Sequence, residues 1–104
     1  MTARYRVEYL PAAERDLLDI LDYIARDRPV AARAFVDRLE RAIGRLAQFP
    51  RAGRLPSDDR LRRPGYRILF VGNDLVFSVL TRRTVEIRRV VHGARRYEFL
   101  MPKD

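Results

Sequence analysis

Several residue types that carry common protein chemistry are scarce or missing in this sequence. None of the 104 residues is cysteine, which excludes disulfides, a thiolate nucleophile and cysteine-ligated zinc, and fits a reducing compartment. His92 is the only histidine, so the usual cluster of metal ligands is missing, and we expect no metal and no cofactor. No apolar run approaches the roughly 20 residues of a membrane span, and the N-terminal residues lack the apolar stretch of a secretion signal. We therefore expect a cytoplasmic protein without a membrane partner.

Acidic residues are too few to balance the basic ones, and the imbalance lies in one half of the chain. Lys and Arg number 22 against 14 Asp and Glu, a formal net charge of +8. Residues 1–50 are nearly neutral, whereas residues 51–104 contain 13 basic and six acidic side chains. Positive potential of this kind attracts an acidic protein or a nucleic acid, and the guanidinium group of arginine suits both carboxylates and phosphates.

Hydrophobic spacing predicts one domain over residues 1–104, which begins with a strand and two helices. Apolar and polar residues alternate over residues 5–10, as in a half-buried strand. Apolar residues three or four positions apart then predict two amphipathic helices that form an antiparallel hairpin over about residues 12–49. We expect Asp27 to cap the second helix and Pro29 to begin it.

The second half predicts a basic loop, a sheet over residues 65–91 and a C-terminal tail over residues 92–104. Three prolines, one glycine and five arginines over residues 50–64 indicate a loop without a helix, in which Asp58 and Asp59 are solvated. Three antiparallel strands follow, at 66–71, 75–80 and 84–91, with turns at Gly72-Asn73-Asp74 and Thr81-Arg82-Arg83. The broken alternation at Arg88-Arg89 predicts a β-bulge. The fold class is therefore α+β: an N-terminal strand, then an antiparallel helical hairpin on one face of a mainly antiparallel sheet, and a three-stranded meander, with many arginines on the other face.

The residues in these elements also resemble a known family. The segments that carry the resemblance lie between residue 5 and about residue 97: Leu10-Pro11-Ala12-Ala13, Asp16 to Ala25, Pro29 to Leu39, Leu46 to Pro50 with Gly53-Arg54, Gly65-Tyr66-Arg67, and Val85 to Arg96. In this order and spacing they are similar to the ParE/RelE-type toxins of bacterial type II toxin–antitoxin systems, also called plasmid stabilisation proteins. The fold that the resemblance implies agrees with the fold predicted above.

The resemblance implies a growth-arresting toxin and its partners. ParE-like members poison DNA gyrase by protein contact, whereas RelE-like members cut messenger RNA on the ribosome. The ending Arg89-Val90-Val91-His92-Gly93-Ala94-Arg95 is more similar to the ParE branch. The family also implies a cognate antitoxin, usually acidic and partly disordered, through which alone operator DNA would be bound. A toxin that has lost its activity and serves only in the antitoxin complex is a third alternative.

The RelE-like alternative requires a base, an acid and cations that stabilise charge on phosphate. Histidine titrates near neutral pH, so His92 is the best proton carrier, unless it only hydrogen-bonds to backbone at the strand end. Arg67 and Arg95 match phosphate-contacting arginines of RelE-like nucleases, and Tyr97 is a further candidate. The loop lacks the lysines of those nucleases, and Tyr97 lies nearer to Arg95 than their pattern requires. We therefore favour gyrase binding and assign no catalytic residue.

We expect the target or the antitoxin to contact arginines of the second half and aromatic residues of the tail. They are Arg62, Arg63, Arg67, Arg88, Arg95, Arg96, Tyr97 and Phe99. The apolar residues of the tail either fold back on the core or form part of an exposed patch. The positive half thus predicts an acidic protein partner first and RNA phosphate second.

Overall fold

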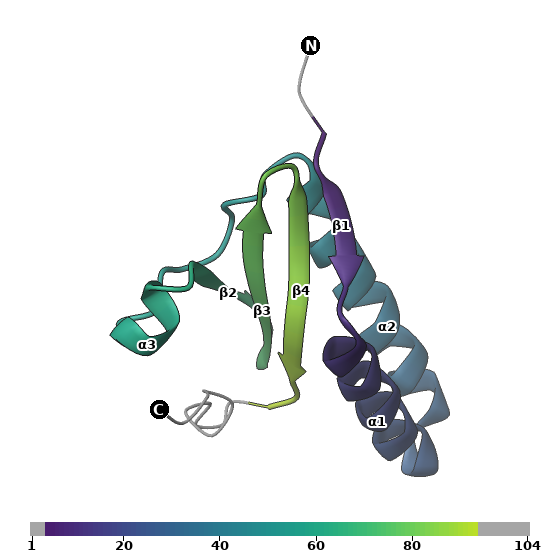
Figure 1. The fold of residues 1–104 in the computed structure, drawn as a ribbon. Helices are drawn as coiled ribbons and strands as arrows, with labels where there is room; N and C mark the ends of the chain where they lie inside the picture. The colour runs from purple at the N-terminus through teal and green to yellow at the C-terminus, as the bar shows by residue number, and fades with distance from the viewer. Residues whose placement is uncertain (1–3, 94–104) are drawn as a thin grey trace.

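The computed structural model describes residues 4–93, which form one sheet with helices on both sides (Figure 1). The elements are β1 (Arg6–Tyr9), α1 (Pro11–Asp27), α2 (Pro29–Gly44), the short 3-10 helix η1 (Arg45–Ala47), α3 (Asp59–Arg62), β2 (Tyr66–Val71), β3 (Asp74–Thr81) and β4 (Thr84–Val91). The strand order is β1-β4-β3-β2, with β1 parallel to β4 and the other pairs antiparallel. The predicted α+β class and the meander are confirmed, within a mixed sheet.

The two long helices form the predicted hairpin on one face of the sheet. Each helix begins with a proline, Pro11 or Pro29, because the first helical turn needs no hydrogen bond from that nitrogen. The predicted Asp27 cap is wrong: Asp27 is the last residue of α1, and Arg28 precedes α2 without a side-chain cap. The chain reverses at Arg28 alone, so Asp27 stays helical. No helix within residues 4–93 is both long and apolar enough to cross a membrane.

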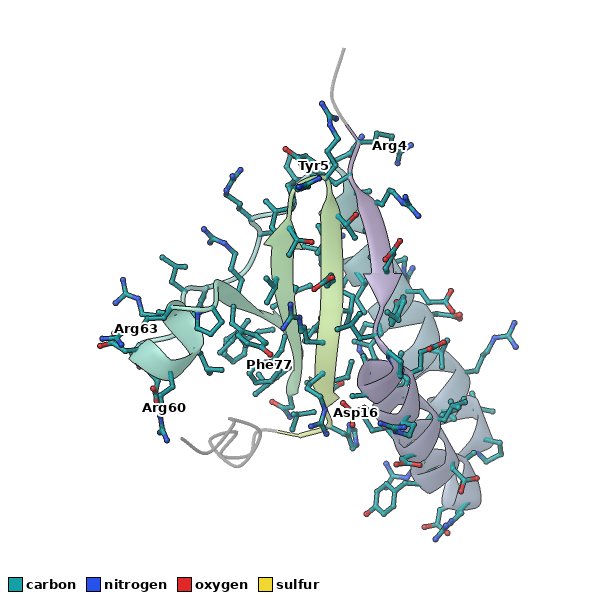
Figure 2. The ribbon with its side chains drawn as sticks, viewed as in Figure 1. Arg4, Tyr5, Asp16, Arg60, Arg63 and Phe77 are labelled. Atoms are coloured by element: carbon teal, nitrogen blue, oxygen red, sulfur yellow. The ribbon has the colours of Figure 1, made fainter. Side chains whose placement is uncertain are left out.

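The main core lies between the hairpin and the sheet. Its buried side chains come from α1, α2, η1 and all strands except β1, namely Ala13, Phe35, Leu39, Ala42, Ile43, Leu46, Val71, Val76, Val85, Ile87 and Val90. Asp16 of α1 ties the hairpin to the sheet beyond the end of β1 (Figure 2), since its carboxylate accepts from Arg89 at 2.8 and 2.9 Å and from the Val90 backbone at 2.8 Å. This side-chain hydrogen bond raises the pKa of Arg89.

The predicted bulge is confirmed, and one turn is shorter than predicted. Phe77 pairs with Arg89 and Ser78 with Ile87, so Arg88 is the extra residue of β4. Gly72 has the positive φ, 62°, that a tight turn needs. Asp74 is not in the turn: it begins β3 and is 3% exposed.

The basic segment 50–64 contains a helix that we did not predict. Asp58 accepts a 2.9 Å hydrogen bond from the backbone N–H of Arg60 and so caps α3, and its hydrogen bonds to Arg60 lower its pKa. Leu61, 3% exposed, packs with Ile68 and Phe77 in a second, smaller core on the other face of the sheet. A single turn anchored by one leucine has no periodicity for sequence analysis to detect. The second face is therefore partly apolar rather than mainly cationic.

Candidate functional site

His92 has the partner that the sequence did not reveal. Its Nδ1 lies 2.7 Å from Oδ1 of Asp74, and the same oxygen accepts from the Gly93 backbone N–H at 3.1 Å. Arg38 of α2 approaches the other carboxylate oxygen at 4.0 Å. The alternative that His92 only hydrogen-bonds to backbone at the strand end is therefore wrong, because Nδ1 of His92 contacts a carboxylate.

The imidazole stands at the rim of a pocket between the far ends of the two long helices and β4. Phe35 and Tyr23 contact the ring edge-on, with centroids 5.5 and 6.5 Å away. The pocket measures about 460 Å³, and its polar lining includes Asp27, Arg28 and Arg38. Since Nδ1 is occupied by Asp74, Nε2 is the ring nitrogen left to meet a molecule in this pocket. The signal for this pair in the sequence was weak, because a carboxylate next to Gly72-Asn73 is typical of a turn.

Arg67 is not brought near His92. Arg67 stands in β2 opposite Ser78, which pairs with Ile87 of β4. His92 lies five residues beyond Ile87 in the chain. Arg67 and His92 are therefore two strands apart across the sheet and four or five residues apart along the strand direction, which separates their backbones by roughly 15–20 Å. The guanidinium of Arg67 instead donates to the backbone oxygen of Arg51 at 3.1 Å. In this structure the two members of the predicted nuclease set therefore do not converge on one site.

Three of the remaining candidates lie within the described residues, and four lie in the tail. Arg88 is held by Glu86 at 2.7 Å and lies over the Tyr66 ring at 5.6 Å, whereas Arg62 and Arg63 are exposed at α3. Figure 2 shows Arg63 at α3, on the far side of the sheet from the helical hairpin. The tail candidates Arg95, Arg96, Tyr97 and Phe99 lie outside the described residues.

An apolar groove between β1 and the two long helices was missed by the sequence analysis. It is lined by Val7, Tyr9, Glu14, Leu17, Leu18, Leu21, Val36, Leu39, Glu40, Ile43 and Gly44, and measures about 620 Å³. Leu18 remains 66% exposed beside it. Burial and the nearby Glu40 carboxylate raise the pKa of Tyr9. The available signal was Leu18 beside Leu17, which widens the apolar stripe of the first helix beyond what the core needs.

Within residues 4–93, no three His, Asp or Glu side chains gather closely enough to hold a metal ion. The described residues thus offer a carboxylate–imidazole pair, two exposed arginines at α3 and an apolar groove.

Comparison with known proteins places these features in context. Residues 7–97 match the family model described as the ParE toxin of the type II toxin–antitoxin system parDE. The fold is similar to that of a chain in the chromosomal ParDE system from P. aeruginosa, with a TM-score of 0.71 and 20% identity over 86% of this chain and 96% of that one. It is also similar to a chain of the RelBE2 toxin–antitoxin complex from Mycobacterium tuberculosis, with a TM-score of 0.62 and 24% identity over 91% and 98%. No curated protein matches the sequence significantly.

Proposed function

We propose a gyrase-inhibiting function for this chain, which belongs to the ParE toxin family of type II toxin–antitoxin systems. In this proposal the toxin arrests growth by binding DNA gyrase, has no chemical step of its own, and is neutralised by a cognate antitoxin. One observation carries the preference for binding over RNA cleavage: His92 lies just past the end of β4, whereas Arg67 lies two strands away on β2, level with the middle of β4, which places their backbones roughly 15–20 Å apart. Metal-independent cleavage needs its base and its cations on the same phosphate.

The test is purified gyrase with plasmid DNA. We expect the free toxin to inhibit supercoiling or to trap cleaved complexes, and the His92→Asn variant to do so equally well, because the Asn amide nitrogen takes the place of Nδ1 and can donate to Asp74, and no proton transfer is required. Inhibition by neither protein would contradict the gyrase proposal. A toxin that also fails to slow growth on expression without an antitoxin would instead support the inactive alternative.

Ribosome-dependent RNA cleavage is the second candidate, and the Asp74–His92 pair favours it. A carboxylate that holds Nδ1 orients the imidazole for acid–base work at Nε2, with Arg38 available beside it. This candidate predicts cut transcripts during growth arrest and their loss in the His92→Asn variant. Arrest with intact transcripts would contradict it.

The apolar groove is the proposed antitoxin site. Two structures similar to this fold are toxin–antitoxin systems or complexes, and an exposed apolar groove suits the apolar face of a segment that folds as it binds. Operator DNA would then be bound only through the antitoxin. The groove is tested by Leu18→Glu, which we expect to weaken binding of the antitoxin from the same operon at least tenfold.

Val30→Glu is the matched control for that experiment. Val30 is 83% exposed on α2 and lies outside the groove lining, so the same apolar-to-acidic change leaves the groove intact. Equal antitoxin affinity in the two variants would show that the groove is not the binding site.

A further inference from the structure

The edge of the sheet opposite the groove combines exposed aromatic side chains with arginines that form no ion pair within residues 4–93. Strand β2 forms this edge, three strand spacings, or about 14 Å, from β1. We call the surface formed by Phe49, Arg51, Arg54, Leu55, Arg67 and Phe70 the β2 edge surface. Phe49, Leu55 and Phe70 are 61%, 57% and 49% exposed, three of the six exposed large apolar side chains within the described residues.

Contacts link most of these residues, and Leu55 directly follows Arg54 in the chain. Arg67 donates to the Arg51 backbone oxygen at 3.1 Å, and the guanidinium of Arg54 lies 5.0 Å from the centre of the Phe70 ring. Arg54 also pairs with Ile68 of β2 through backbone hydrogen bonds of 2.8 and 2.9 Å. The turn at Phe49 is closed by a 3.0 Å hydrogen bond from the Ala52 N–H to the Phe49 oxygen. The surface is therefore fixed by backbone pairing rather than carried on a loose loop.

The charge of this edge is not neutralised within the described residues. Residues 45–70 contain seven arginines against two acids, Asp58 and Asp59. Asp58 is engaged by Arg60 at 2.9 Å, and neither Arg51 nor Arg54 forms an ion pair with any residue between 4 and 93. On the helices, by contrast, Arg26 and Arg33 each have a carboxylate four residues away in sequence within 4 Å.

We propose that the β2 edge surface docks onto an acidic, partly apolar patch of the toxin's protein target. Aromatic side chains and arginine are enriched in protein interfaces, with apolar anchors at the centre and charge at the rim. Interfaces with duplex DNA are more polar, so three exposed apolar anchors favour a protein. The inference rests on the proposed function, because it requires a protein target. It also separates the two partners: the target meets the β2 edge while the antitoxin occupies the groove beside β1.

The experiment compares two triple variants of the full-length toxin. The edge variant carries Phe49→Ser, Arg51→Glu and Arg54→Glu. The control carries Val30→Ser, Arg26→Glu and Arg33→Glu, which likewise replace one exposed apolar residue and two exposed arginines, here on the helices. We expect the edge variant to need at least tenfold more expression to arrest growth, with unchanged antitoxin affinity and circular dichroism, while the control behaves as the wild type.

Growth arrest by the edge variant at wild-type expression would overturn the inference, whatever gyrase assays show. So would loss of antitoxin affinity in the same variant, because the two surfaces would then not be separate. If the wild type and the control bind duplex DNA and the edge variant does not, the surface binds a phosphate backbone, and the inference of a protein patch is wrong. Growth arrest that needs the edge, together with normal gyrase activity, would contradict the gyrase proposal but support the inference for another protein target.

Discussion

The imidazole of His92, at the end of β4, is held by the buried carboxylate of Asp74, at the start of β3, over a distance of 2.7 Å. The two residues are 18 positions apart and meet because β3 and β4 are antiparallel neighbours. Asp74 also accepts from the Gly93 N–H at 3.1 Å, so one carboxylate fixes both the ring and the backbone that leads into the C-terminal segment.

Replacing Asp74 is expected to destabilise the protein. Asp74→Ala leaves the Gly93 N–H and the Nδ1 side of His92 without their acceptor in a part-buried setting, at a cost of about 1–3 kcal/mol. Asn73→Ala, one residue away on the exposed turn, should stay within about 0.5 kcal/mol of the wild type. Urea unfolding at pH 7 measures both, and equal midpoints would show that the Asp74 contacts contribute nothing to stability.

The hydrogen bonds between Asp16 and β4 should contribute about as much to the stability of the protein as those of Asp74. Asp16→Ala removes the acceptor of two Arg89 hydrogen bonds and of the Val90 N–H, and we expect the free energy of unfolding to fall by about 1–3 kcal/mol. Asp19→Ala, an exposed position on the same helix, is the control and should change stability little. Thermal unfolding distinguishes them; a loss of the same size in the control would assign the effect to the helix rather than to the contact.

Two glycines should respond to alanine in opposite directions. Gly53 has φ of 111°, and a Cβ there would lie 3.0 Å from the Ile68 carbonyl oxygen, so Gly53→Ala should cost about 1–3 kcal/mol. Gly44 lies at the end of α2 with nothing within 4 Å of a Cβ, so Gly44→Ala should stabilise by about 0.5–1 kcal/mol. A urea midpoint of Gly53→Ala at or above that of the wild type would contradict the close approach of Gly53 to β2, and a lower midpoint for Gly44→Ala would contradict the open space at Gly44.

The raised pKa of Tyr9 predicts that the protein loses stability at alkaline pH. Burial and Glu40 raise the pKa of its phenol above the ordinary value of about 10, so folding favours the neutral form. The contribution is complete below the unfolded pKa and is lost as pH rises through the folded pKa. Tyr9→Phe should therefore lose less stability than the wild type as the pH rises above the ordinary tyrosine pKa of about 10. Urea unfolding at a series of pH values tests this, with Tyr23→Phe, at an exposed tyrosine, as the control.

The helical hairpin and the β-meander could be predicted because each depends on local spacing. Apolar residues every three or four positions mark α1 and α2, and Gly72 marks the turn between β2 and β3. The bulge at Arg88 was also visible, since an extra residue breaks a period of two. Helix α3 was not predicted, because its four residues depend on one leucine that packs against strands later in the chain.

The sequence by itself determined the family, the α+β class and the concentration of arginine in the second half, because order, periodicity and composition are properties of the chain alone. Only the tertiary structure decided which side chains share a site. Antiparallel pairing of β3 with β4 brings Asp74 to His92, whereas the order β1-β4-β3-β2 keeps Arg67 at the far edge. Partners across a sheet are set by register and strand order, which depend on how the whole core packs.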